Sequence, residues 1–110
     1  MMICIIEYFI SRNMLKFEWN PAKEKANQRK HRVDFKEAAT VFRDPMGITF
    51  YDPDHSGEED RFMTVGFSTK GKLLMVAHTE RGDQIRIISA RELTQVERKA
   101  YEEEINRRKR

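Results

Sequence analysis

FEWNPAKEKANQRKHRVDFKEAATVF, residues 17–42, contains two helix starts in close succession and decides the order of the elements. Asn20 followed by Pro21 is typical of an N-cap and a first helical position, so a helix is expected to run to about His31. This helix has few apolar residues, which makes it poor core material. Its basic end, residues 30–32, suits the negative end of the helix and favours contact with a polyanion.

A second helix is expected directly after the first. Asp34 with Glu37 three residues later indicates an N-cap and a capping box. The proline of Asp44-Pro45 disfavours a helical residue before it, so the second helix should end there. The chain therefore predicts two short helices with almost no linker between them.

The remaining segments alternate apolar and polar residues, as strands do. Turn residues separate them closely enough for antiparallel hairpins. A capping box at Thr94 and Glu97 begins a last helix, with an apolar stripe at Val96, Ala100, Tyr101 and Ile105. The predicted class is α+β, with two N-terminal helices, an antiparallel sheet of about four to five strands and a C-terminal helix on one face. The expected strands are residues 15–19, 47–51, 61–67, 72–79 and 84–90.

Length and composition allow one domain and a mild preference for anions. A chain of 110 residues has no room for a second core. The formal net charge of +3 and the pI near 9.1 favour an anionic partner only weakly. With Cys4 as the single cysteine, neither an intramolecular disulfide nor a cysteine zinc site can form, which fits a reducing cytosol.

The first ten residues are apolar but too short to span a bilayer, and they lack the features of a signal peptide. Two interpretations remain for this segment. It is either an additional strand or arm that packs on a partner, or an early start upstream of the natural domain. We expect the second, with residues 1–13 as an extension and residues 14–110 as the single domain.

The acidic loop of residues 52–60 nearly matches a calcium-binding EF-hand loop, with four ligand positions and the glycine of the sixth position filled. The twelfth position requires a glutamate and holds Met63, and a strand follows where a helix should, so calcium is rejected. His55 could join these carboxylates around a transition metal, but a loop histidine is more often simply exposed. The matching residues are Asp52, Asp54, Ser56, Gly57 and Asp60.

Basic residues recur along the predicted sheet. Arg61 opens one strand, His78 closes the next, and Arg86 and Arg91 lie within and after the third. A cation inside an apolar strand needs a partner or a sheet edge, so an ion pair, for example of Arg86 with Glu80, explains any one of them. The set is better explained by convergence on one face or one rim.

Such a cationic sheet with a histidine suits cleavage of RNA without a metal. The reaction needs a base for the 2′-hydroxyl, cations for the phosphorane and an acid for the leaving oxygen. Arginine binds phosphate in bidentate fashion, and the ordinary pKa of histidine lies near neutrality. Motifs for other chemistries, such as a phosphate-binding glycine loop, GxSxG or HExxH, are absent from the sequence.

Five segments together resemble the BrnT family of bacterial type II ribonuclease toxins: FEWNPAKEKANQRKH, VDFKEAATVF, RFMTVGFS, LLMVAHTERGDQIRIISAREL and ERKAYEE. The resemblance covers roughly residues 14–103. It implies a compact RelE-like fold and a cytoplasmic endoribonuclease that inhibits translation. It also implies neutralisation by a BrnA-type antitoxin that supplies DNA binding. A homodimer is left open, and no membrane association or cofactor is expected.

Combining the residues with this resemblance gives a set of expected site residues. The catalytic residues are expected among Arg61, His78, Arg86, Arg91 and His31, with the choice of histidine open. RNA binding is assigned to Lys30, Lys72 and Tyr101, and no metal site is expected. Two positions depart from the family pattern, with Asn20 where aspartate is usual and Arg32 where glycine is usual. A binding protein without catalysis, such as a degenerate toxin that holds an antitoxin or RNA, is the alternative.

Overall fold

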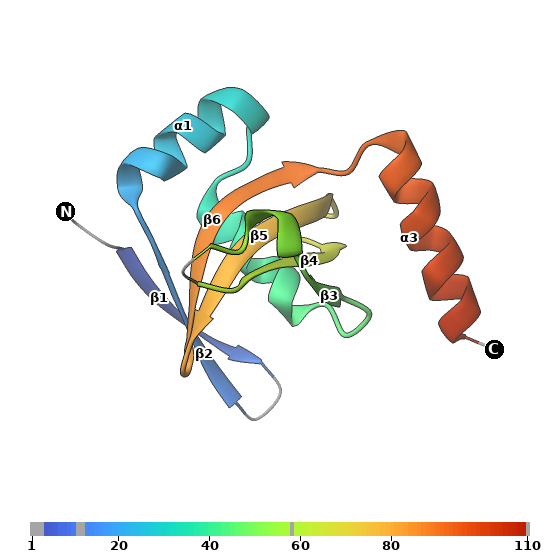
Figure 1. Ribbon diagram of the computed structural model, residues 1–110, viewed down its shortest axis with the longest axis horizontal. Helices are drawn as coiled ribbons and strands as arrows, with labels where there is room; N and C mark the ends of the chain where they lie inside the picture. Colours follow the sequence, from blue (N-terminus) through green and yellow to red (C-terminus); the bar gives the residue numbers. More distant parts are fainter. Residues whose placement is uncertain (1–3, 11–12, 58, 110) are drawn as a thin grey trace.

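The computed structural model describes residues 4–10, 13–57 and 59–109, and their strands form one six-stranded sheet in the order β1-β2-β6-β5-β4-β3 (Figure 1). The strands are β1 (Cys4–Ile10), β2 (Asn13–Trp19), β3 (Ile48–Tyr51), β4 (Arg61–Phe67), β5 (Leu73–Arg81) and β6 (Gln84–Glu92). The helices are α1 (Pro21–His31), α2 (Phe35–Thr40) and α3 (Gln95–Arg108), with short 3₁₀ turns η1 (Val41–Arg43) and η2 (Pro53–His55).

The α+β class is confirmed, and the arrangement differs from the expectation in two respects. First, two strands precede the helices α1 and α2: β1 was not among the expected strands, and it pairs antiparallel with β2 and brings the sheet to six strands. The sheet is also mixed, since residues 16–18 of β2 run parallel to residues 84–86 of β6. The chain leaves β2, passes through α1, α2 and the strands β3 to β5, and returns in β6 beside β2 in the same direction. Short-range patterns in the sequence do not reveal a pairing between segments so far apart. The domain boundary at residue 14 stays a prediction.

Helix α1 is held by hydrogen bonds more than by apolar packing. Its N-cap Asn20 accepts hydrogen bonds from the backbone N–H groups of Ala22 and Lys23, at 2.8 and 3.3 Å. The amide of the buried Asn27 accepts from the Ala90 N–H at 3.1 Å and donates to the Ala90 carbonyl at 2.8 Å. β2 pairs with β6 only at residues 84–86, and further along β6 the Asn27 amide satisfies the backbone groups of Ala90 that a neighbouring strand would otherwise bond. This anchor explains how so polar a helix packs on the sheet.

One face of the sheet carries the main core. Helix α2 covers this face, and its N-cap Asp34 accepts a hydrogen bond from the Glu37 N–H at 2.7 Å. The fully buried Phe17, Trp19 and Phe35 lie in this core together with Leu74, Val76 and Ile87. The helix starts at Asn20 and Asp34 lie where the sequence predicted them, but the second start is an N-cap without a capping box, because the Glu37 carboxylate accepts a hydrogen bond from the Ser68 hydroxyl instead.

A β-bulge in β6 decides which residues share the opposite face. His78 of β5 pairs with Ile87, and Ala77 pairs with Ser89, so Ile88 is an extra residue in the ladder. Because the bulge shifts the alternation by one residue, Arg86 and Arg91 lie on the same face despite their odd separation in sequence. Arg61 of β4 also lies on this face, which we call the arginine face.

Helix α3 follows β6 and stands at the far end of the arginine face (Figure 1). Its capping box is present, with Thr94 and Glu97 bonded reciprocally. Of the described residues of α3, only Tyr101 is buried, whereas Val96 is 81% exposed. Half of the expected apolar stripe therefore faces solvent. Among the described residues, none of the helices is both long and apolar enough to cross a membrane.

Candidate functional site

Two arginines and a threonine form a row across three adjacent strands on the arginine face. Arg61 of β4 pairs with Thr79 of β5, and Thr79 pairs with Arg86 of β6. Directly opposed residues in antiparallel strands project to the same side, so both guanidinium groups flank Thr79. A polar cavity of about 350 Å³ opens over this row, and its lining includes Lys23 of α1. Three cations from three elements therefore line one cavity.

The hydrogen-bonding capacity of this row is only partly used within the described residues. The Thr79 hydroxyl is buried and has no hydrogen-bond partner among them. The Nε of Arg86 lies 3.3 Å from Glu18 Oε1 but also lacks a hydrogen bond of good geometry. No ion pair of the Arg61 guanidinium is found in the described part of the chain. Buried polar groups are normally satisfied, so these atoms mark a place suited to an oxyanion.

Carboxylates at the rim balance part of this positive charge. The guanidinium of Arg81 binds Glu59 through two hydrogen bonds, of 2.7 and 2.6 Å. That contact lowers the pKa of Glu59, so the carboxylate stays ionised. Glu18, which is buried, lies beside Arg86 and 3.9 Å from Arg81. The expected partner Glu80 is thus replaced by Glu18, which reaches Arg86 through the parallel contact of β2 with β6.

The loop between β3 and β4 closes the cavity on its other side. Its His55 lines the cavity, and the His55 Nδ1 lies 2.9 Å from the Asp52 carboxylate. The Ser56 hydroxyl donates to the Asp52 carbonyl at 2.6 Å and accepts from the Arg61 N–H at 2.9 Å. The loop is therefore fixed to the first residue of β4. Among the described residues, no cluster of histidine, cysteine and carboxylate side chains is arranged to bind a metal ion.

His78 lies inside the protein, away from the cavity. Its side chain is 0% exposed and lies between the rings of Phe42 and Phe62, with centroids 4.9 and 6.0 Å away. Its Nε2 is 2.7 Å from the Thr64 hydroxyl. Burial lowers the pKa of His78 to about 4, so the ring is neutral at physiological pH. His78 therefore has no access to RNA here, since its strand position turns it to the core face.

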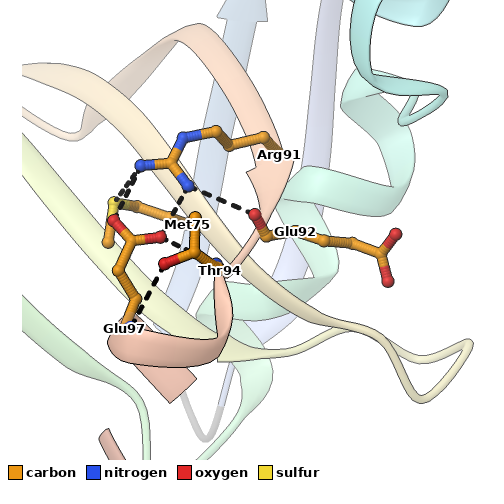
Figure 2. A network of polar contacts seen from close by, with 5 residues as sticks. All are labelled: Met75, Arg91, Glu92, Thr94 and Glu97. Carbon is orange, nitrogen blue, oxygen red and sulfur yellow. Dashed lines mark hydrogen bonds and ion pairs between the residues drawn. The ribbon is translucent and has the colours of Figure 1, made fainter. Parts of the chain in front are cut away.

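Arg91 shares the arginine face but is committed to α3. Figure 2 shows its guanidinium held by Glu97, with hydrogen bonds of 2.7 and 2.8 Å, and in contact with the Met75 sulfur and the Glu92 carbonyl. The same Glu97 closes the helix cap by accepting from the Thr94 N–H at 2.9 Å. The pKa of Glu97 falls to about 2, chiefly through the Arg91 hydrogen bonds. Arg91 thus joins the end of β6 to α3.

The other expected site residues are dispersed. Lys30 and His31 end α1 beyond Asn27, and neither lines the cavity. Lys72 precedes β5 at the opposite end of the strand from Thr79, roughly 20 Å along the chain at about 3.3 Å per residue. Tyr101 is 8% exposed, and its ring packs edge-on against Phe67. Burial is the main reason why the pKa of Tyr101 is raised.

Of the residues that line the cavity, Arg61 and Arg86 were selected as site residues from the sequence, whereas Thr79, Lys23 and His55 were not. Lys23 lies in the first turn of α1, and it lines the cavity with Arg86 because the Asn27 hydrogen bonds hold α1 against β6. His55 was interpreted as an exposed loop histidine, and its position beside Arg61 depends on the bonds of Ser56. The sequence signal for Lys23 was its place among the positions that match the BrnT pattern, and the signal for His55 was its spacing from Asp52 within the acidic loop.

Comparisons with known proteins give one matching family model and a similar solved structure. A family model described as the ribonuclease toxin BrnT of type II toxin-antitoxin systems matches residues 19–97. The crystal structure at 1.1 Å of the ribonuclease toxin BrnT from Brucella abortus is similar, with a TM-score of 0.55 and 21% identity. The similarity covers 70% of this chain and 94% of that chain, and at this identity it shows a common fold. No curated protein compared with the chain matches it.

Proposed function

The chain belongs to the BrnT family of ribonuclease toxins of type II toxin–antitoxin systems, and we propose that it cleaves RNA without a metal ion at the cavity over Arg61, Thr79 and Arg86. The observation that supports this site is the row of two arginines around a threonine, with Lys23 facing them. RNA offers the cavity a phosphate with two oxygens that guanidinium groups bind well.

The charges of the site fit the demands of phosphoryl transfer. Arg61 and Arg86 come from strands on either side of β5, so a phosphate over Thr79 would meet a cation on each side. Charge increases on the phosphorane oxygens in the transition state, and cations held in place on either side stabilise that charge. Lys23 would hold a neighbouring phosphate. His78, Arg91 and Tyr101 act in folding, and Lys30, His31 and Lys72 lie outside the reacting site.

The partner follows from the same membership. A type II module supplies a protein antitoxin, and we propose that it is of the BrnA type and carries the DNA binding of the complex. We further propose cytoplasmic action on cellular RNA, with residues 14–110 as the toxin domain. A homodimer is an additional proposal. The oligomeric state of the chain alone, measured by light scattering, tests it.

The decisive experiment is cleavage of purified RNA by the purified chain in the presence of EDTA. Wild-type protein is expected to cleave, and Arg61→Ala and Arg86→Ala are each expected to lose about 100-fold or more, because each removes one cation from the transition state. Arg98→Ala is the matched control, since Arg98 lies exposed on α3 and lines no part of the cavity. Cleavage only after addition of a divalent ion would overturn the proposal.

The alternative is a protein that binds an antitoxin without catalysis. It is favoured by α3, whose Tyr101 borders two mainly apolar grooves of about 440 and 240 Å³. Induction without antitoxin separates the two proposals. Arrested growth that Arg86→Ala relieves supports the ribonuclease, whereas normal growth together with a stable complex on co-expression supports the binding protein.

A further inference from the structure

His55 and Asp52 form a dyad at the mouth of the arginine cavity. The Nδ1 of His55 lies 2.9 Å from the Asp52 Oδ2, which leaves the Nε2 without a partner among the described residues. The side chain of His55 is 64% exposed, in contrast to the inaccessible His78. Of the three histidines in the sequence, His55 is the one that lines the cavity with Arg61 and Arg86.

The loop holds this dyad in a defined place relative to the arginines. The Asp52 N–H donates to the Arg61 carbonyl at 2.8 Å, and the Ser56 hydroxyl bridges the Asp52 carbonyl and the Arg61 N–H. Both ends of the short segment from Asp52 to Ser56 are thus bonded to Arg61. A displacement of the dyad would require breaking the bonds to the same residue that brings a guanidinium to the cavity.

Stability alone does not account for this contact. An exposed pair of this kind contributes little to the stability of the folded state, and often nothing measurable. A carboxylate on Nδ1 has a second effect, because it fixes the tautomer in which Nδ1 carries the proton and Nε2 accepts one. It also stabilises the imidazolium that forms when Nε2 takes that proton. This is the arrangement of a general base.

We propose that His55 is the general base of the RNA cleavage and that Asp52 is its positioning residue, an assignment that rests on the proposed function. The His55 Nε2 takes the proton of the ribose 2′-hydroxyl as the 2′-oxygen forms a bond to phosphorus. The bond from phosphorus to the 5′-oxygen breaks, and that oxygen takes a proton from water. The imidazolium then gives its proton to the hydroxide. The products are a 2′,3′-cyclic phosphate and a 5′-hydroxyl.

The test uses the full chain, a short RNA, and the same RNA with the 2′-hydroxyl at the cleavage site replaced by hydrogen as a non-cleavable ligand. His55→Gly is expected to lower the cleavage rate about 100-fold or more while the affinity for the non-cleavable ligand stays unchanged. Added imidazole, which is small enough for a cavity of this size, is expected to restore part of the rate. Arg86→Ala is expected to lose affinity as well and to gain nothing from imidazole.

Asp52→Asn provides the positioning test, with Asp54→Asn as its control because Asp54 is exposed in the same loop and undergoes the same change of charge. Asp52→Asn is expected to lower the rate and change the pH–rate profile on the acidic side, whereas Asp54→Asn is expected to match wild type. Full activity of His55→Gly beside an active wild type would overturn the role of His55 and leave the proposed function standing. An inactive wild type would overturn the proposed function itself.

Discussion

His78 should make the stability of this protein fall steeply in mild acid. In the unfolded chain its pKa is near 6.5, and burial lowers it to about 4 in the folded protein. Between these two pKa values His78 is protonated in the unfolded state and neutral in the folded state. Its contribution to the free energy of unfolding is therefore fully present above pH 6.5 and is lost as the pH falls towards 4. The shift of 2.5 units, at about 1.36 kcal/mol per unit, amounts to about 3 kcal/mol at the acid limit and about 2 kcal/mol at pH 5.

The assay is urea unfolding between pH 7.5 and pH 5, followed by fluorescence of the single tryptophan. Trp19 is 1% exposed in the folded protein, so its emission reports the core directly. The matched variant is His78→Gln, whose amide can still bond Thr64 but carries no titrating group. Carboxylates contribute equally to both proteins, so the difference between their slopes isolates His78.

We expect the wild type to lose about 2 kcal/mol more than His78→Gln over this range. The absolute stability of the variant is not decisive, because a buried amide changes packing at every pH. Parallel curves for the two proteins would refute the reasoning, since they would mean that His78 is protonated in the folded state or that its surroundings admit water. Such a result would also reopen a role for His78 in proton transfer.

Three further predictions concern the remaining features. Arg32, the C-cap of α1, has φ 58° and ψ 33°, a left-handed conformation that costs a residue with a side chain about 1 kcal/mol. Arg32→Gly should therefore raise the free energy of unfolding by about 1 kcal/mol, whereas the control Arg29→Gly, inside the helix, should lower it by about 1 kcal/mol. Asn27→Ala removes three buried hydrogen bonds to Val33 and Ala90, and should lower the free energy of unfolding in urea by about 2–4 kcal/mol. The control Asn106→Ala, at an exposed position of α3, should lower it by about 0.5 kcal/mol or less, and an equal loss in both variants would contradict the role of Asn27 in holding α1. Arg91→Ala should leave RNA cleavage intact and weaken the attachment of α3 to β6. A double-mutant cycle with Glu97→Gln should give a coupling free energy of about 1 kcal/mol. Loss of cleavage in a folded Arg91→Ala protein would show that Arg91 belongs to the catalytic residues.

The elements that the sequence predicted well are those with local causes. Asn20, Asp34 and Thr94 each cap a helix by bonds within a few residues, so the starts of α1, α2 and α3 follow from short patterns. The strand expected over residues 61–67 is present as β4, but its burial does not alternate, because Thr64, Val65 and Gly66 are all buried between packed faces. In contrast, the parallel pairing of β2 with β6 joins segments far apart in the chain, and no short pattern encodes it.

The candidate site was predicted in part for the same reason. Arg61 and Arg86 were selected because cations within strands are conspicuous, and the structure brings them to one cavity. His78 was selected by residue type, but its position among apolar neighbours turned it to the core. Arg91 was selected for the same reason as Arg86, but its guanidinium donates both of its short hydrogen bonds to Glu97. Which cations are left for a ligand depends on such partners, which only the folded chain reveals.

The extra residue Ile88 has a consequence for how the family can vary in length. Every residue after it in β6 has its side changed relative to a regular strand, including Arg91, and α3 starts from that altered phase. A chain shortened by one residue at Ile88 would form a regular strand, in which Arg91 still pairs with Met75 and stays on the arginine face beside Glu97, whereas a chain shortened by two residues between positions 86 and 91 would turn Arg91 toward the core. Loss of one residue here should therefore be tolerated and loss of two should be rejected, so a sequence alignment across this strand should show one-residue gaps but no two-residue gaps.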